Sequence, residues 1–372
     1  MNFSEYFKKR EKEIINFLKE LVFLESPTHD KNAVDKCSNF YFEELKKLGI
    51  KTSKITQKEI GDFGFAELPG KSNEKILVLL HIDTVWKIGK IKEMPFKIEG
   101  EKIFGPGVLD MKAGAVMVYF AFKAIKDSGL KPKKTISVFC NSEEETGSHH
   151  SEKFIIDSAK KSKYVLCLEP ALPDGSLKMQ RKGRMVGKLI TFGKSAHGSS
   201  PHKGVNAIIE LSHQLLKLKK VQKGGITINV GLIRGGEKVN VVPDSAEAIL
   251  DIRFWKTKDK EKIIDFFNYL KPKMEGAKLK FQVLSFRPPM EKTRVSFNLF
   301  RRIKRIGKKL GIEIKAGKSG GGSDASFASN IGIPTVDGLG PVGNGIHSEN
   351  EHLYIASLLE RTTLLTELFL KL

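Results

Sequence analysis

The sequence predicts an α/β protein in which one layered α/β domain is interrupted by an inserted α+β domain. Three observations lead to this fold class. Up to Pro170, continuous apolar runs of strand length alternate with segments of helical periodicity. Beyond Pro170, strands with a half-exposed pattern group with two helices into a compact unit of their own. After Pro288 and Pro289 a helix and short strands return, so we expect the chain to re-enter the first domain.

The first α/β portion begins with two helical segments. Apolar residues recur at helical spacing over residues 5–24 and again over residues 32–48, after which Gly49 provides a helix-ending residue. The strands that follow are continuously apolar, which indicates burial on both faces of a sheet. The later elements of this portion are a strand at 76–82, a helix at 113–125, and strands at 135–140 and 164–168.

The inserted portion has the order strand, helix, strand, strand, helix, strand. Residues 184–192 alternate as in a half-exposed strand, and residues 205–218 have the pattern of an amphipathic helix. The remaining elements are strands at 227–232, 248–254 and 279–285 and a helix at 260–270. This order resembles a ferredoxin-like split β-α-β unit. The next helix, at 298–310, belongs to the returning α/β portion.

The length of 372 residues favours two domains, because a single hydrophobic core seldom grows that large. We expect the α/β domain to comprise residues 1–178 and 289–372. Residues 179–288 then form the inserted domain.

The net charge of +21 comes mainly from lysine, because 11 of the 64 basic residues are arginines. The lysines are spread along the chain, whereas nucleic-acid-binding proteins concentrate charge on one face and add a recognition motif or aromatic stacking. We therefore expect no nucleic-acid partner. The charge is better interpreted as a solvated lysine-rich surface, which also attracts anionic substrates.

The chain has no apolar stretch long enough to cross a bilayer, and its first residues lack the basic and apolar regions of a secretory signal. The three cysteines, Cys37, Cys140 and Cys167, cannot all pair and form no Cys-x-x-Cys motif. They fit a reducing compartment in which cysteine serves as a small buried hydrophobic residue. We therefore expect a cytoplasmic protein without a membrane partner.

Polar residues follow several of the predicted strands. His81 and Asp83 come directly after the apolar run at 76–80, where His81 could ligate a metal and Asp83 could orient its imidazole. Such a pair is often merely structural when it stands alone. Asp110 lies just before the helix at 113–125, where its carboxylate could bridge two cations or simply cap the helix.

Glu143, Glu144 and Glu145 follow the strand at 135–140. Three adjacent carboxylates at a buried strand end are costly unless cations neutralise them, although a solvated acidic loop would need no cation. One of these glutamates could bind a metal while its neighbour acts as a general base. Glu169, at the end of another strand, and His347, in a glycine-rich loop, are not diagnostic singly.

Five of these residues together have the number and the chemical hardness of a ligand set for two metal ions. Imidazole and carboxylate ligands suit zinc, with one aspartate shared between the ions, and they also accept Co²⁺ or Mn²⁺. The predicted ligands are His81, Asp110, Glu145, Glu169 and His347. We therefore expect two Zn²⁺ ions per subunit.

The order of these motifs resembles the family of co-catalytic zinc exopeptidases and deacylases. That family includes glutamate carboxypeptidase, aminoacylase, acetylornithine deacetylase and succinyl-diaminopimelate desuccinylase. The likeness spans nearly the whole chain and is greatest for glutamate carboxypeptidases of the carboxypeptidase G type. The motifs are His-x-Asp-Thr-Val from His81, Gly-x-Gly-x-x-Asp-x-Lys-x-Gly from Gly105, Glu-Glu-x-Gly-Ser from Glu144, Glu-Pro from Glu169, Gly-Gly-Gly-Ser-Asp-Ala from Gly320, and His-Ser from His347.

The resemblance implies a three-layer α/β/α zinc-peptidase catalytic domain with an inserted ferredoxin-like lid and dimerisation domain. It also implies individual roles. His81 and Glu169 would hold one zinc, Glu145 and His347 the other, and Asp110 would bridge both. Glu144 matches the general base of the family, and Asp83 matches its histidine-orienting aspartate.

His197 resembles the inserted-domain histidine that reaches a neighbouring subunit's active site and polarises the scissile carbonyl. The resemblance therefore implies a homodimer formed through the inserted domain. The spacing from His197 to Gly204 is one residue shorter than in the carboxypeptidase G type, so the local loop should differ. His202 is a rival for the same role, and an ordinary surface histidine is the alternative for His197.

Recognition of a substrate carboxylate would use an arginine fork and glycine-rich backbone N–H groups. The resemblance assigns this recognition to Arg253, Asn240, Arg287, Gly321, Gly322 and Ser323. Arg253 could instead form a structural ion pair with Asp251 or Glu247.

The resemblance implies a zinc-dependent carboxypeptidase that hydrolyses an amide bond through a metal-bridging hydroxide and releases a C-terminal amino acid, with glutamate the expected residue. The substrate would be a small peptide or an N-acyl amino acid. An N-acyl amino acid deacylase of the acetylornithine deacetylase or desuccinylase type is the alternative. A non-catalytic metal-binding or nucleic-acid-binding module is a further reading, against which the general base Glu144 argues, because a binding module needs no such group.

Overall fold

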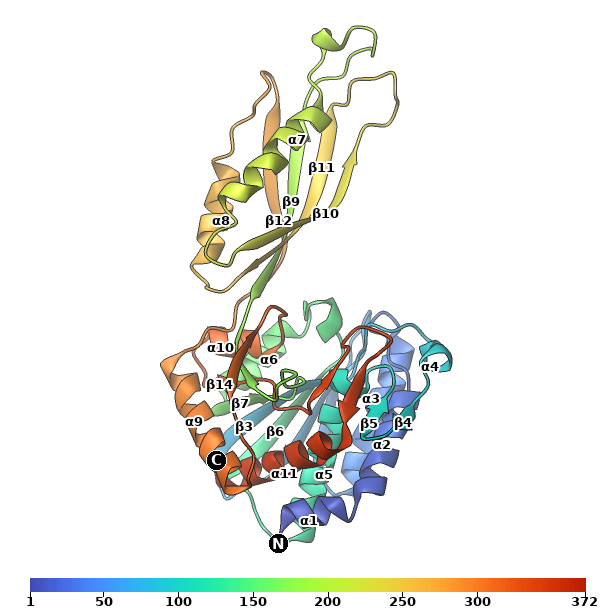
Figure 1. Cartoon of the computed structure of the whole chain (residues 1–372), viewed down its shortest axis with the longest axis vertical. Coiled ribbons are helices and arrows are strands. Elements are labelled where there is room, and N and C mark those ends of the chain that lie inside the picture. The colour runs from blue at the N-terminus through green and yellow to red at the C-terminus, as the bar shows by residue number, and fades with distance from the viewer. The chain divides into compact units, whose positions relative to one another are not determined.

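The computed structural model describes residues 1–372, which divide into two compact units (Figure 1). Unit 1 comprises Met1–Met179, Lys292–Ser319 and Ser323–Leu372, and unit 2 comprises Gln180–Glu291 together with Gly320–Gly322. The predicted fold class, an α/β domain with an inserted α+β unit, is confirmed. The grouping of Gly320–Gly322 with unit 2 was not foreseen from the sequence.

Unit 1 is built on a six-stranded sheet in the order β1-β2-β6-β3-β7-β14. Four neighbouring strands (β6, β3, β7 and β14) run parallel, whereas β2 and β1 continue the sheet in antiparallel fashion. The strands are β1 (Lys51–Ile55), β2 (Phe63–Leu68), β3 (Ser72–His81), β6 (Lys134–Asn141), β7 (Tyr164–Cys167) and β14 (Thr335–Val336). Parallel strands place their carboxyl ends along one edge, so the segments after β3, β6 and β7 meet there.

The sheet of unit 1 is covered on both faces, which explains why its strands are continuously apolar. Ile76, Val78 and Leu80 of β3 belong to the largest hydrophobic cluster, whereas the intervening Leu77 and Leu79 are buried outside that cluster. Because successive side chains of a strand point to opposite faces, burial of both sets requires a helical layer on each side. The unit therefore has three layers.

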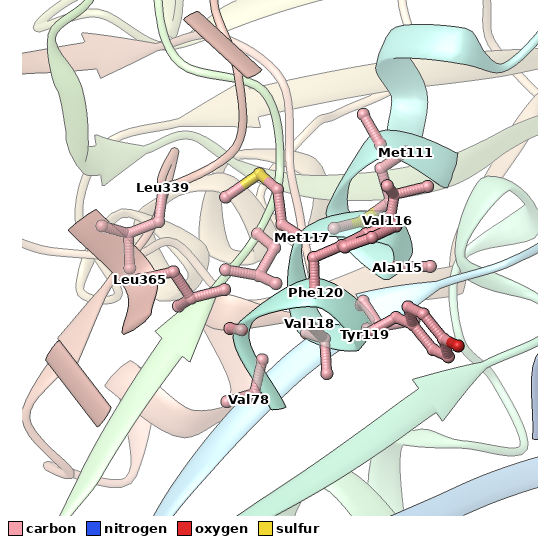
Figure 2. Packing of buried hydrophobic residues seen from close by; sticks show 14 of the residues in the cluster. Val78, Met111, Ala115, Val116, Met117, Val118, Tyr119, Phe120, Leu339 and Leu365 are labelled. Atoms are coloured by element: carbon pink, nitrogen blue, oxygen red, sulfur yellow. The ribbon is translucent and has the colours of Figure 1, made fainter. Parts of the chain in front are cut away.

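One helical layer supplies most of the large cluster. Figure 1 shows α5 and α11 lying along the same face of the sheet, and Figure 2 shows Met117 and Phe120 of α5 packed near Val78 and Leu365. Burial of a side chain such as Met117 stabilises the fold by about 1.5–3 kcal/mol. The helices that contribute to this cluster are α1 (Phe3–Lys8), α2 (Glu11–Phe23), α3 (Lys31–Lys47), α5 (Ala113–Asp127), α9 (Arg294–Lys309) and α11 (Ile355–Lys371).

The opposite face of the sheet is covered by α6 (Glu152–Lys160) and α10 (Ala325–Asn330). The ring of Phe63 packs against Phe139 of β6 and Phe154 of α6, with centroid distances of 5.7 and 5.4 Å. This aromatic packing holds α6 against the sheet as the second helical layer.

The single helix expected at residues 5–24 is wrong, because the segment forms two helices, α1 and α2, that break at Lys9 and Arg10. Arg10 has φ −110° and ψ 14°, and its guanidinium carbon lies 3.7 Å from the centroid of the Tyr6 ring. Both helices turn apolar residues toward the same core, so the apolar spacing runs on through the break and conceals it.

Short strands that the sequence did not reveal form a second sheet in unit 1, in the order β15-β16-β5-β4. Its strands are β4 (Lys97–Glu99), β5 (Lys102–Phe104), β15 (Gly343–Asn344) and β16 (His352–Tyr354), and the short helix α4 (Lys90–Glu93) precedes them. A two-stranded sheet joins β8 (Leu177–Arg181) to β13 (Ala316–Ser319). The pairing of β5 with β16 joins the segment before Asp110 to the segment after His347.

Unit 2 confirms the ferredoxin-like arrangement. Its four strands form an antiparallel sheet in the order β10-β11-β9-β12, and two helices pack on that sheet. The elements are β9 (Gly183–Phe192), α7 (Ala207–Lys217), β10 (Thr227–Gly235), β11 (Ser245–Phe254), α8 (Asp259–Asn268) and β12 (Lys278–Arg287). The unit has its own core, in which Phe267 stacks on Phe281 with the ring centroids 3.9 Å apart.

All three cysteines are free and buried, as expected of small hydrophobic residues. Not one helix combines the length and the apolar character that crossing a membrane would require.

Candidate metal centre

His81 is the last residue of β3, and its side chain is 2% exposed. Its Nδ1 lies 3.0 Å from the backbone oxygen of Asp83. The tautomer that donates Nδ1–H to this carbonyl keeps the lone pair of Nε2 available for a cation. That Nε2 lies 3.2 Å from Asp110 Oδ1 and 3.7 Å from Glu169 Oε1, so the imidazole faces two carboxylates.

Asp83 is completely buried. The sequence suggested that it orients His81, but its carboxylate also binds other groups. Its Oδ1 lies 3.4 Å from His81 Nδ1, which is longer than the contact to the backbone carbonyl. The carboxylate accepts hydrogen bonds from the backbone N–H groups of Glu144 and Glu145, both at 3.2 Å. It also accepts a 2.8 Å hydrogen bond from the Thr28 hydroxyl. Asp83 therefore fixes the turn that carries two of the predicted site residues.

Asp110 presents one carboxylate oxygen to each of two histidines. Oδ1 faces His81, and Oδ2 lies 3.4 Å from His347 Nε2. Burial alone would raise the pKa of Asp110, but hydrogen bonds from His347 and His81 hold that pKa well below its ordinary value. The helix-cap alternative does not hold, because α5 begins at Ala113 and has no side-chain cap. The Asp110–Met111 peptide bond is cis.

The three adjacent glutamates have separate surroundings. Glu143 is buried and accepts hydrogen bonds from the backbone N–H groups of His150 and Ser151, at 2.6 and 2.7 Å, so it holds the start of α6. Glu144 is half-buried, and Glu145 extends toward His347, with Oε2 3.1 Å from Nε2. A solvated acidic loop is therefore excluded for Glu143 and Glu145, whose side chains are 2% and 7% exposed.

The acid–base states of Glu145 and His347 reflect their pairing. Burial raises the pKa of Glu145 to about 8; the hydrogen bond with His347 opposes this shift and the charge of Asp110 adds to it. Hydrogen bonds to Asp110 and Glu145 raise the pKa of His347 to about 10. A carboxylate or an imidazole must lose its proton to bind a metal ion, so a metal ion would compete with protons at these groups.

The remaining two predicted ligands come from loops. Glu169 lies two residues beyond β7 and is buried. His347 lies in the loop between β15 and β16, has a φ of 59°, and keeps its side chain 48% exposed. This exposure leaves one side of the cluster accessible to a substrate.

The structure brings all five predicted ligands together in unit 1. They form two groups of three, within each of which the possible ligand atoms lie within 4.8 Å of one another. One group is His81, Asp110 and Glu169, and the other is Asp110, Glu145 and His347. Two imidazoles and three carboxylates with one shared aspartate are a donor set that fits two divalent metal ions.

Sequence reasoning gave no role to Glu351, although this residue borders the same centre. It is 1% exposed, and its carboxylate accepts hydrogen bonds from the backbone N–H groups of Gly107, Leu109 and Asp110. Burial raises the pKa of Glu351 to about 7 in spite of these hydrogen bonds. A glutamate whose partners are mainly backbone groups leaves no spacing signal by which a sequence could reveal it.

The predicted site residues of unit 2 lie partly in exposed loops. His197 is exposed, and its Nδ1 lies 2.8 Å from the hydroxyl of Ser199. The neighbouring Gly198 donates its N–H to the backbone oxygen of Asn240, at 2.7 Å, so this loop lies against the loop of Asn240. His202, the rival histidine, is also exposed.

Three arginines of unit 2 surround the segment Gly320–Gly322. Arg253 donates to the oxygen of Gly320 at 3.1 Å, and a Cβ atom added to Gly322 would lie 3.0 Å from Cδ of Arg287, which is buried. Arg181, which the sequence did not single out, donates to the oxygen of Gly322 at 2.8 Å. The segment therefore lies in strongly cationic surroundings.

Two of the predicted substrate-binding residues have internal partners. Arg253 forms the anticipated alternative, an ion pair in which its Nε lies 2.9 Å from Asp251 Oδ1. Ser323 belongs to unit 1, where it is buried and donates its hydroxyl to Asp337 Oδ2 at 2.7 Å. A direct substrate contact by either residue stays a prediction.

The model of "Peptidase family M20/M25/M40" matches residues 77–371. Carboxypeptidase G2 of Pseudomonas sp. (strain RS-16) is 30% identical, over 96% of this chain and 89% of that protein. A succinyl-diaminopimelate desuccinylase of Wolinella succinogenes is 25% identical, over 76% of this chain and 81% of that protein.

Among solved structures, one similar fold is that of the Bacillus subtilis YXEP protein, described as a dinuclear metal binding peptidase from the M20 family. The TM-score is 0.73 at 14% identity, and the match covers 98% of each chain. The extent of the family match and the identity to carboxypeptidase G2 confirm the resemblance that the motifs indicated. The chain therefore belongs to peptidase family M20/M25/M40 and is a metallohydrolase of that family.

Proposed function

We propose that this protein is a zinc-dependent carboxypeptidase that hydrolyses the amide bond before a C-terminal amino acid, with glutamate as the preferred residue. The observation that carries the proposal is the presence of two three-donor groups that share Asp110. Glu144 lies beside them, on the same turn as Glu145. The similarity to carboxypeptidase G2, which spans 96% of the chain, supports a carboxypeptidase over other reactions of the family.

Two zinc ions would supply Lewis acidity toward the amide carbonyl and the attacking water. We assign His81 and Glu169 to one ion and Glu145 and His347 to the other, with Asp110 holding both. The assignment follows the two groups, in which Asp110 turns a different oxygen toward each histidine. Co²⁺ or Mn²⁺ would suit the same donors.

Glu144 is the proposed general base. It would take a proton from the attacking water and later deliver a proton to the departing nitrogen. Its backbone N–H is held by Asp83, whose carboxylate also holds the N–H of Glu145. The base and a metal ligand are thus fixed by one buried group, which limits their movement relative to each other.

Unit 2 has features that suit recognition of an anionic substrate. Arg253, Arg287 and Arg181 surround Gly320–Gly322, and guanidinium groups bind carboxylates in bidentate fashion. We assign carboxylate binding to Arg287 and this glycine segment, with Asn240 and Ser323 as further contacts. The substrate class is a small peptide or N-acyl amino acid that ends in a free carboxylate.

We propose that the protein is a homodimer through unit 2 and that His197 polarises the scissile carbonyl of the partner's substrate. Strand β10 lies at the edge of its sheet and exposes Leu232 and Ile233, at 55% and 58%. Exposed apolar residues on an unpaired edge strand favour association with another copy.

The second candidate is an N-acyl amino acid deacylase. It would use the same metal ligands and differ in the substrate groups that unit 2 recognises. The similarity to a succinyl-diaminopimelate desuccinylase over 76% of the chain favours this alternative.

One experiment separates the two candidates. The purified chain is treated with chelator, reconstituted with zinc, and assayed for amine release. The panel comprises peptides and folate that end in glutamate, peptides that end in other residues, and acetylated or succinylated amino acids. We expect activity to vanish on chelation, to return with zinc, and to be highest with glutamate-terminated substrates. Turnover of the acylated amino acids alone would replace the carboxypeptidase with the deacylase, and chelator-resistant activity would refute both.

A further inference from the structure

Glu351 receives four hydrogen bonds although the proposed chemistry gives it no task. Its Oε1 accepts from the backbone N–H groups of Leu109 and Asp110, at 2.9 and 3.0 Å. Its Oε2 accepts from the N–H of Gly107 at 3.0 Å and from the indole N–H of Trp86 at 3.1 Å. The carboxylate is thus fully used by donors inside unit 1.

The backbone around Asp110 needs an anion at this position. Three N–H groups, of Gly107, Leu109 and Asp110, converge on one point, and such a concavity of backbone donors binds negative charge. Gly107, Leu109 and Asp110 are all buried, so without an acceptor their N–H groups would be unsatisfied. Gly107 adopts a φ of +71°, which a residue with a side chain rarely adopts. Glu351 therefore makes this conformation stable.

Glu351 also connects three segments that each carry a predicted metal ligand. Trp86 follows the segment of His81, the three backbone donors belong to the segment of Asp110, and His347 lies four residues before Glu351 itself. The pairing of β5 with β16 continues the same connection beyond Glu351, whose backbone oxygen accepts from the N–H of Gly105 at 3.4 Å. One side chain thus ties together the loops of both histidines and of the shared aspartate.

We propose that Glu351 is a positioning residue that sets the metal affinity of the centre by holding the Asp110 segment against the His347 loop. The inference rests on the proposed metal centre. It predicts unequal effects on the two groups. Asp110 and His347 both belong to one group, whereas the other contains Asp110 with His81 and Glu169. The ion held by Asp110, Glu145 and His347 therefore depends on Glu351 more strongly.

Glu210 offers a matched control in unit 2. It is also a fully buried glutamate whose carboxylate accepts backbone N–H groups, those of Lys273 at 3.0 Å and Met274 at 2.7 Å. None of the predicted metal ligands lies in its segment. Loss of such a carboxylate from either unit should lower stability, but only the loss of Glu351 should change metal binding.

The experiment titrates zinc into the metal-free full chain and measures both dissociation constants, for wild type, Glu351→Gln, Glu351→Asp and Glu210→Gln. Amide hydrogen exchange of residues 105–112 is followed in the absence of metal. We expect Glu351→Gln to raise one of the two zinc dissociation constants by about 10–100-fold and the other by less, and to speed exchange at residues 107, 109 and 110. With zinc in excess, kcat should fall more than KM rises. Glu210→Gln should leave both zinc affinities unchanged.

Glu351→Asp separates position from charge, because it keeps the negative charge but moves the oxygens away from the N–H groups. It should bind zinc as poorly as Glu351→Gln, and a wild-type affinity would overturn the positioning role. If Glu351→Gln does not fold, Trp86→Phe removes a single donor and should weaken zinc binding to a smaller degree, whereas an unchanged affinity would count against the proposal. If the wild type binds zinc and Glu351→Gln binds it equally well, this inference is overturned but the metal centre is not. A wild-type chain that binds no zinc overturns the metal centre as well.

Discussion

The two units hold most of their predicted functional residues in different ways, although His347 of unit 1 is half-exposed and Arg287 of unit 2 is buried. In unit 1, His81, Asp83, Asp110 and Glu169 are buried, and their polar atoms face one another across the ends of parallel strands. In unit 2, His197 and Asn240 are exposed, and Arg253 is engaged with Asp251. Burial of several ionisable groups is costly unless they neutralise one another or bind cations. Such a buried cluster in unit 1 is therefore itself evidence for a functional site. Exposed polar residues carry no such cost and no such signal.

The difference separates two kinds of task. The cluster of unit 1 is rigidly supported by buried carboxylates such as Asp83, which suits groups that must hold ions and move protons within narrow limits. The loops of unit 2 carry side chains at the surface, which suits recognition of a substrate or of another copy of the chain. Metal binding and proton transfer should therefore depend on unit 1 in an all-or-none manner, whereas changes in unit 2 should alter the rate or the affinity by degrees.

The largest expected effect is that of Glu144→Gln in unit 1. Removal of the proposed general base should lower kcat by about 10²–10⁴-fold, while the zinc content stays that of the wild type, because Glu144 belongs to neither three-donor group. Steady-state kinetics and metal analysis of the same sample test both parts.

Glu145→Gln is the matched contrast, because it alters the adjacent residue of the same turn. It should lose one of the two ions, since it changes a proposed ligand and leaves the proposed base in place. If Glu144→Gln retained near-normal kcat, or if the two variants exchanged their metal contents, the assignment of base and ligand would have to be reversed or abandoned.

The sequence predicted which side chains of unit 1 lie close together, and the reason is physical. Apolar runs at 76–80 and 135–140 located buried parallel strands, and the carboxyl ends of such strands lie along one edge. His81 and Glu145 could therefore be expected near each other although 64 residues separate them in the numbering. The helical and strand patterns of unit 2 were equally clear, because each element has one face on the core.

Features that depend on the backbone could not be predicted in this way. Glu351 binds mainly backbone groups, and Arg181 donates to the backbone oxygen of Gly322. The β5–β16 pairing involves strands of three residues each, which are too short for a periodic pattern. The role of Asp83 was foreseen only for His81, since nothing in the sequence shows that its carboxylate reaches the N–H groups of Glu144 and Glu145.

A core substitution in unit 2 tests whether the two units are independent of each other. Leu250 is completely buried in the separate core of that unit, so Leu250→Ala should destabilise unit 2 by about 2–5 kcal/mol. The zinc affinities of unit 1 should not change, because no ligand lies in this core. Each unit contains one tryptophan, Trp86 in unit 1 and Trp255 in unit 2, so fluorescence of single-tryptophan variants follows each unit during denaturation, while zinc affinities are measured with both tryptophans in place. Weakened zinc binding by Leu250→Ala would mean that the units are not independent in this respect.

The smallest effect concerns the acid stability of unit 2. Burial alone would raise the pKa of Asp251, but hydrogen bonds from Arg253 and Arg184 lower it below its ordinary value. A group whose folded pKa is depressed contributes stability above its unfolded pKa, about 3.9, and that contribution is lost as the pH falls through the folded pKa. Because these side chains are partly exposed, the loss should amount to about 0.2–1 kcal/mol.

Asp251→Asn tests this contribution and the competing role of Arg253 together. The variant should be slightly less stable than the wild type at pH 7 and should lose less stability than the wild type below pH 4, as measured by denaturant unfolding at each pH. It also releases Arg253 from its ion pair, 2.9 Å at Nε. If Arg253 is used for substrate carboxylates, its release should lower KM for glutamate-terminated substrates, whereas an unchanged KM would assign Arg253 to the structure of unit 2. If the variant and the wild type lost stability equally at low pH, the ion pairs of Asp251 would not contribute to the stability of unit 2.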